Sequence, residues 1–119
     1  MAQLVMNNEL DKYKEFLDEV VSLKEATASV WVLKGSYPNT SDNEYRNEIL
    51  ASLPEHQRTE IAKMIQEAKE SGIHDLLAFM SQECSISYQG KVLPPEPFGT
   101  ELNFDFIARS EGDEWPEEP

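Results

Sequence analysis

The stretch "IAKMIQEAKESGIHDLLAFM", residues 61–80, decides how many helices the chain forms, because a glycine interrupts its helical pattern. Before the glycine, apolar side chains recur at steps of three and four, and after it the same spacing resumes as far as Cys84. A glycine inside a helix lowers helix stability, so Gly72 either bends one helix or separates two. We expect separation, with Ser71–Asp75 marking the end of one helix and the start of the next.

The segment before this stretch contains an amphipathic helix over residues 10–21, in which charged side chains stand between apolar ones at helical spacing. The helix either continues to residues 30–33 or gives way there to a strand, because that cluster is rich in β-branched residues. Gly35 ends the segment in both cases. Ser41 and Ser52 each stand three residues before a glutamate, which is the spacing of a capping box, and they predict the starts of two further helices.

After Cys84 the sequence no longer shows a helical pattern. Residues 85–93 alternate around Gln89–Gly90, which predicts a β-hairpin with a two-residue turn. Prolines in residues 94–97 then enforce an extended link. The apolar side chains of residues 100–109 alternate as in a strand, whereas Gly112 is placed to cap a helix over the same residues, and both remain open. The chain is therefore predicted to be a mainly helical α+β protein, with three or four helices, a small β-hairpin and an acidic C-terminal tail.

The length of 119 residues predicts a single domain, 1–119, whose last part, 112–119, forms a loosely packed acidic tail. Apolar residues make up 39% of the chain, which is enough for a folded core. The lone cysteine, Cys84, excludes an intrachain disulfide and fits a reducing compartment. The N-terminus lacks the features of a signal peptide and no segment is apolar enough to cross a membrane, so we expect a cytoplasmic location.

The charge is strongly negative and unevenly distributed. The chain has 23 acidic and 10 basic side chains, a formal charge of −13, and eight of the acids lie with one base between Glu96 and the C-terminus. Such a surface repels nucleic-acid phosphates and anionic membranes, so we expect neither to be bound directly. If the acidity serves binding, the partner is a basic protein; otherwise it only keeps the protein soluble.

His74 and Asp75 are the residues that most resemble a catalytic pair. Adjacent helical residues point about 100° apart, so Asp75 is poorly placed to orient the imidazole, and Glu70 is better placed if the helix is continuous. The simpler interpretation is that Asp75 lies in a first helical turn and that His74 packs at the edge of the core. The sequence leaves open whether His74 is buried or lines a cleft.

No metal site and no cofactor are predicted. His56 and Glu60 share a helix face but supply only two ligands, and Cys84 lies about 15 Å along a helix from His74. The chain has no phosphate-binding glycine loop, dinucleotide fingerprint or nucleophile elbow, and its five glycines leave little room for one. These absences favour a protein that is not an enzyme.

Two aromatic residues lie beside prolines in predicted loops, where rigid apolar anchors for partner proteins also occur. We treat Phe98, Trp115 and the neighbouring Glu114 as candidate partner-binding residues, although such aromatics more often pack in the core of so small a domain. Homodimerisation that covers apolar surface is a further possibility, with no heptad pattern to indicate it.

The stretches "LPEHQRTEIAKMIQEAKESGIHDLLAFM" (53–80), "PPEPFGTELNFDFIAR" (94–109) and "EGDEWP" (111–116) resemble a family of small uncharacterised bacterial proteins that carry a domain of unknown function. The resemblance covers most of the chain and is least distinctive in the N-terminal helix. It implies a soluble bacterial protein with a single domain, and it brings no activity, substrate or catalytic residue with it.

The leading hypothesis is a non-enzymatic protein that acts through protein–protein contact, with its acidic C-terminal quarter covering a basic partner. The rival hypothesis is a small-molecule-binding or hydrolytic domain that uses His74 with Glu70 or Asp75. An accessible His74 in a cleft beside a second titratable group would favour the rival, and a packed His74 would remove it.

Overall fold

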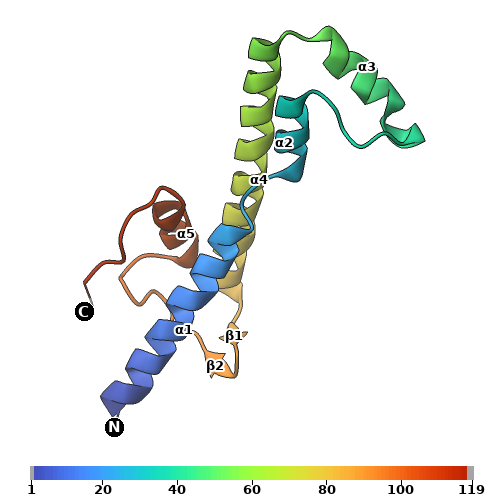
Figure 1. Cartoon of the computed structure of the whole chain (residues 1–119). Coiled ribbons are helices and arrows are strands. Elements are labelled where there is room, and N and C mark those ends of the chain that lie inside the picture. Colours follow the sequence, from blue (N-terminus) through green and yellow to red (C-terminus); the bar gives the residue numbers. More distant parts are fainter. Residues whose placement is uncertain (1, 118–119) are drawn as a thin grey trace. The chain divides into compact units, whose positions relative to one another are not determined.

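The computed structural model describes residues 2–117, with side chains from residue 8 onward (Figure 1). The fold is mainly helical with one antiparallel hairpin, which confirms the predicted α+β class. In chain order the described elements are α1 (Ala2–Ser22), α2 (Thr27–Lys34), the 3₁₀ turn η1 (Ser41–Asn43), α3 (Glu44–Ser52), α4 (Glu55–Glu83), β1 (Ser87–Tyr88), β2 (Lys91–Val92) and α5 (Leu102–Ser110). Within this part of the chain, no helix combines the length and the apolar character that crossing a membrane requires.

The chain divides into two compact units. Unit 1 comprises residues 1–23 and 72–119, and unit 2 comprises residues 24–71. Each unit has a hydrophobic core of its own. The prediction of a single domain stays a prediction, because a division by contacts does not test whether either unit folds alone.

Helix α4 corrects the expectation of a helix break at Ser71–Asp75, because it runs for 29 residues without interruption. Gly72 is exposed, keeps a negative φ and has no atom near the position that a Cβ would occupy. A helical glycine costs about 1 kcal/mol relative to alanine. This cost is small beside the burial of Ala62 and Leu77, which lie on the packed face of α4 before and after the glycine.

Three other local expectations are decided by the structure. Helix α1 ends at Ser22, and residues 30–33 belong to the separate helix α2 instead of a strand. Gly35 ends α2 as predicted, with a φ of 103° and its N–H bonded to the carbonyls of Trp31 and Val32. The capping boxes are wrong, because neither η1 nor α3 begins with a side-chain cap, and the Ser52 hydroxyl donates back to the Ile49 carbonyl.

Unit 2 is held together by a small apolar cluster and by side chains that bond to the backbone. Val32, Leu50 and Ala62 are buried together. Gln66 on α4 closes the loop before α2, since its Oε1 accepts from the Ala26 N–H at 2.8 Å and its Nε2 donates to the Lys24 carbonyl at 2.7 Å. These contacts hold residues 24–26 against α4, in a segment that the sequence pattern could equally have made part of a continuous helix.

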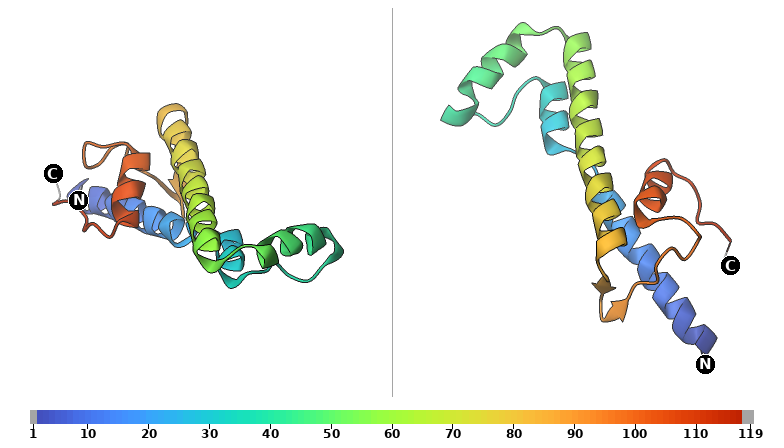
Figure 2. Two further views of the ribbon diagram at one scale, coloured as in Figure 1. Left: turned by 90° about the horizontal axis from the view of Figure 1, so that it is seen from above. Right: turned by 180° about the vertical axis from the view of Figure 1, so that it is seen from behind.

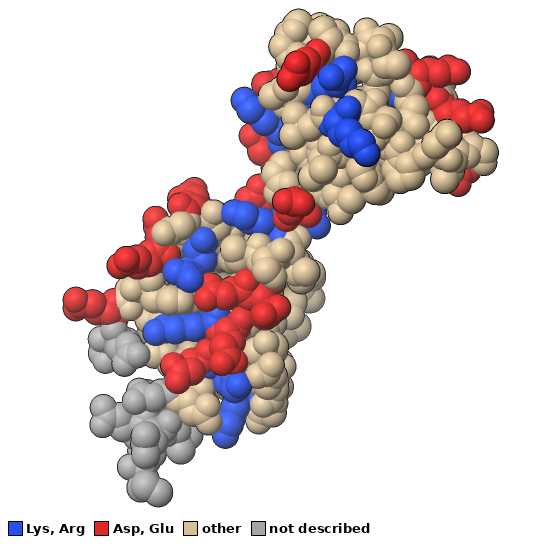
Figure 3. Space-filling model, in the orientation of Figure 1, with Lys and Arg blue, Asp and Glu red and all other residues tan. Residues whose placement is uncertain are grey.

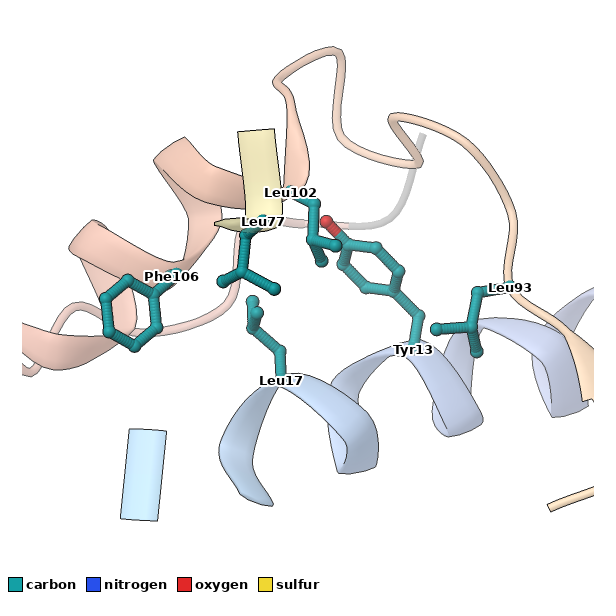
Figure 4. Packing of buried hydrophobic residues seen from close by; sticks show 6 residues of the cluster. All are labelled: Tyr13, Leu17, Leu77, Leu93, Leu102 and Phe106. Atoms are coloured by element: carbon teal, nitrogen blue, oxygen red, sulfur yellow. The ribbon is translucent and has the colours of Figure 1, made fainter. Parts of the chain in front are cut away.

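Unit 1 is organised around α1, which is flanked by α5 and by the hairpin (Figure 2). The hairpin forms where it was predicted, with Gln89 and Gly90 at φ values of 50° and 79° in the turn. Residues 102–110 form a helix, which decides the open choice over 100–109. The buried side chains of the core point toward one another from α1, α4, α5 and the strand end (Figure 4): Tyr13, Leu17, Leu77, Leu93, Leu102 and Phe106.

Candidate functional site

His74 packs against α5 within unit 1. Its Nε2 lies 3.2 Å from the Nδ2 of Asn103, and its Nδ1 lies 3.3 Å from the Oδ1 of Asp75. Asn103 is only 2% exposed, and the ring of Phe104 meets the imidazole edge-on with centroids 5.9 Å apart. The two ring nitrogens thus face the Asn103 amide on one side and the Asp75 carboxylate on the other. His74 therefore links α4 to the buried face of α5.

The other two members of the predicted catalytic set, Asp75 and Glu70, differ in their surroundings. The Asp75 side chain is 82% exposed, so its contact with His74 is solvated and weak. Glu70 accepts a hydrogen bond from Gln66, one turn before it on α4. The described contacts of His74 are with Asp75, Asn103 and Phe104, none of which carries a nucleophilic hydroxyl or thiol.

The buried polar centre of unit 1 is Asp105, which is 8% exposed. One carboxylate oxygen accepts a hydrogen bond from the Tyr13 hydroxyl, and the other accepts a hydrogen bond from the Thr100 hydroxyl. The three residues come from α1, from the loop before α5 and from α5 itself. A buried carboxylate without donors is costly, so this network ties α5 and its preceding loop to α1.

The same network controls the ionisation of Tyr13. Burial raises the pKa of the Tyr13 phenol well above its ordinary value of about 10, and the hydrogen bond to Asp105 and the negative charges of Asp105 and Glu96 raise it further. The phenol stays protonated over the physiological range and keeps donating to Asp105. Its role is structural, since a hydroxyl held in this way is unavailable as a base.

The two loop aromatics cover Tyr13. Phe98 and Trp115 stack with centroids 5.7 Å apart, and each meets the Tyr13 ring edge-on at 6.2 and 6.3 Å. The guanidinium of Arg109 lies 4.5 Å from the Trp115 ring centroid. Phe98 and Trp115 therefore anchor the C-terminal segment to the core, and the exposed Glu114 lies beside this anchor. Of the predicted tail, residues 118–119 lie outside the described residues.

Unit 1 also contains an open pocket of about 220 Å³. Its walls come from the end of α4, the hairpin, the proline-rich link, α1 and the start of α5, and they are mostly apolar. The polar side chains on the wall include Ser81, Ser85 and Glu96, and the lone thiol, Cys84, is exposed there. His74 is not among the lining residues.

The negative charge belongs almost entirely to unit 1. This unit has 15 acidic and four basic side chains, a formal charge of −11, whereas unit 2 has eight acidic and six basic ones, a charge of −2. Figure 3 shows acidic side chains across the face of unit 1 with a few basic ones between them. Five exposed acids form no salt bridge with any described residue: Glu96, Glu111, Asp113, Glu114 and Glu117.

Among the described residues, no group of three or more His, Cys, Asp or Glu side chains is arranged to hold a metal ion. His56 is exposed near the start of α4, and Cys84 is exposed just beyond its end. The features present are thus a half-buried histidine, whose side chain is 29% exposed, a buried Tyr–Asp–Thr network, a pocket with one carboxylate, and a strongly acidic surface.

Sequence reasoning missed Asp105, which was counted with the acids of the C-terminal quarter. If residues 102–110 are taken as a helix, Asp105 lies on the same face as Leu102 and Phe106, and this position identifies it as a buried carboxylate. A carboxylate on the buried face of a helix needs donors, and Tyr13 and Thr100 provide them.

A family described as a family of unknown function, DUF6547, matches the chain over residues 6–117, and the chain therefore belongs to this family. The match spans both units and leaves out only a few residues at each end. No curated protein and no solved structure matches the chain.

Proposed function

We propose that the protein acts through protein–protein contact and that the acidic surface of unit 1 binds a basic partner. The observation that carries the proposal is the concentration of charge, since unit 1 holds −11 of the formal charge of −13. A charge spread evenly for solubility alone would fall on both units. Complementary potentials accelerate encounter with a basic partner and select against acidic ones.

The arrangement of side chains supports the same proposal. Arg109 already has Asp18 as its partner, at 3.0 Å, and Lys12 has Glu15, at 2.9 Å. The exposed acids near the C-terminal anchor have no such partner among the described residues. Unpaired surface carboxylates on a packed scaffold are free to pair with the lysines and arginines of another protein.

The predicted partner-binding residues take different parts in this proposal. Glu114 is exposed and available to a partner, whereas Phe98 and Trp115 hold the acidic segment in place by packing on Tyr13. The partner is then held by charges displayed on an ordered segment, which lowers the conformational entropy lost on binding. We place the protein in the bacterial cytoplasm, where a single exposed thiol stays reduced.

The rival proposal, a small-molecule-binding or hydrolytic domain that uses His74, has less support. The imidazole nitrogens face Asp75 and Asn103, and the residue lies outside the lining of the described pocket. A hydrolase would need a substrate site beside His74.

Capture from a lysate of the native host at low salt, followed by elution with a salt gradient, tests the proposal. The expected result is the capture of a protein with a basic isoelectric point that elutes by about 0.5 M salt. At that ionic strength, salt screens the attraction between charges that are more than a few ångströms apart. A captured protein with an acidic isoelectric point, one that stays bound at high salt, or the absence of any captured protein would refute the proposal.

A further inference from the structure

The pocket of unit 1 combines a long apolar wall with one negative group. Leu93 and Leu102 are 7% and 4% exposed and form part of its floor, and the proline-rich link forms one side. Glu96 is the one ionisable carboxylate that lines it, and no lysine, arginine or histidine does. The volume of about 220 Å³ has room for a chain of several heavy atoms, since a water molecule in the liquid occupies about 30 Å³.

The electrostatic field in this pocket is negative. Glu96 is exposed, forms no salt bridge with a described residue, and acts on the Tyr13 phenol from the pocket side. Asp105 adds a second negative charge directly behind Tyr13. An anion would be repelled by both carboxylates, and a neutral alkyl group would leave Glu96 without a counter-charge.

We propose that this pocket receives the alkyl cation of a lysine or arginine side chain from the basic partner. The methylene stem lies along the apolar wall and the charged head meets Glu96, which is how long basic side chains bury their stems and keep their heads paired. The hydroxyls of Ser81 and Ser85 are further acceptors on the wall. The inference rests on the proposed function and deepens it by naming the group that the partner inserts.

Cys84 provides a direct reporter, because it is the single cysteine of the chain, is exposed and lines the pocket. Its rate of modification is measured with two methanethiosulfonate reagents that differ in charge, the 2-aminoethyl cation and the 2-sulfonatoethyl anion. The cation is expected to react on the order of tenfold faster than the anion, since a focused negative field raises the local concentration of cations.

Two variants separate the pocket from the general acidity of unit 1. Glu96→Gln removes the carboxylate of the pocket, and Glu111→Gln removes an equally unpaired exposed carboxylate outside it. The rate ratio is expected to fall severalfold in Glu96→Gln and to change little in Glu111→Gln. Equal ratios in the two variants would overturn the proposal. Far-UV circular dichroism of both variants establishes that each is folded.

Protection of Cys84 identifies the ligand chemistry. n-Butylammonium and n-butylguanidinium, the end groups of lysine and arginine, are expected to slow the modification in a saturable way. Sodium butyrate and n-butanol are expected to leave it unchanged. Protection by n-butanol as strong as that by the two cations, or no protection by either cation, would overturn the proposal.

The two proposals fail in different ways. If a basic partner is captured and eluted by salt but the cations do not protect Cys84, the partner binds the acidic surface without using the pocket, and this inference is wrong. If the cations protect Cys84 but no basic partner is captured, the proposed function is wrong, and so is the identification of the cation as a partner's side chain.

Discussion

Tyr13→Phe isolates the contribution of the buried hydrogen-bond network, because it removes one hydroxyl and leaves the ring in the core. Tyr13 is 2% exposed and donates to Asp105, whose other described donor is the Thr100 hydroxyl. A hydrogen bond to a charged group contributes about 1.5–3 kcal/mol, and its loss leaves a buried carboxylate with one donor fewer. We expect the free energy of unfolding to fall by about 2 kcal/mol at pH 7, a large part of the ~5–15 kcal/mol typical of a domain.

Urea denaturation measures this loss. With a denaturant slope of about 1–3 kcal/mol per molar, the midpoint is expected to move down by on the order of 1 M. Tyr88→Phe is the matched control, since the described partner of its hydroxyl is the exposed Gln89 amide, and the loss of stability is expected to stay within about 0.5 kcal/mol.

The stabilisation that the Tyr13 hydroxyl provides is expected to decrease at high pH. Burial and Asp105 raise the pKa of Tyr13 in the folded protein, so the unfolded chain loses this proton first as the pH rises past about 10. The stabilisation is therefore complete below pH 10 and declines above it, by up to about 1.4 kcal/mol per pH unit. The stability difference between the wild type and Tyr13→Phe should shrink between pH 9 and pH 11.

The common titration of the other tyrosines and of the lysines cancels in that difference. An unfolding free energy of Tyr13→Phe within 0.5 kcal/mol of the wild type at pH 7 would refute the structural role of the network. A difference that stays constant up to pH 11 would refute the assignment of the raised pKa to Tyr13.

Four further substitutions test the fold, each by urea denaturation. Gly72→Ala is expected to stabilise the protein by about 0.5–1 kcal/mol, because the residue is helical and its Cβ meets nothing, whereas Gly35→Ala at a φ of 103° is expected to cost about 1–2 kcal/mol. Destabilisation by Gly72→Ala would contradict the continuous α4. Leu17→Ala should cost about 2–5 kcal/mol, since the side chain is fully buried, and a loss below 1 kcal/mol would contradict its place in the core. Trp115→Ala is expected to lower stability by about 1–3 kcal/mol and to expose the C-terminal segment to protease, and unchanged proteolysis would count against its role as an anchor.

Much of the fold follows from local patterns that agree with their surroundings. The helix over residues 10–21 and the hairpin turn at Gln89–Gly90 have a clear period and suitable turn residues, and both form as predicted. The failure at Gly72 has a physical reason. A glycine cost of about 1 kcal/mol cannot break a helix whose apolar face continues on both sides, so tertiary packing prevails over local propensity.

The segment 100–109 shows why some choices need the three-dimensional structure. The alternation of Phe104 with Phe106 suggests a strand, whereas the spacing of Leu102 and Phe106 suggests a helix. In the structure the segment is a helix that buries Leu102 and Phe106 and leaves Phe104 53% exposed.

In the candidate site too, contacts between sequence neighbours could be predicted, whereas contacts between distant segments could not. The weakness of the His74–Asp75 pair follows from helix geometry alone, and its solvated contact agrees with that reasoning. The Tyr13–Asp105 bond and the pocket join segments that are far apart in the sequence, and no spacing rule links them. The charge could be counted in advance, but its concentration in unit 1 depends on residues 1–23 packing with residues 72–119.

Whether the acidic surface of unit 1 binds a basic partner is best tested with two variants that each lose four negative charges, one variant in unit 1 and the other in unit 2. One variant carries Glu111→Gln, Asp113→Asn, Glu114→Gln and Glu117→Gln in unit 1. Its matched control carries Glu25→Gln, Asp42→Asn, Glu48→Gln and Glu67→Gln, all exposed acids of unit 2. The measurement is the amount of the salt-eluted partner that each protein retains from the same lysate. We expect a loss of at least tenfold for the unit 1 variant and near-normal retention for the unit 2 variant. Equal retention by the two variants would show that the acidic surface of unit 1 does not bind the partner.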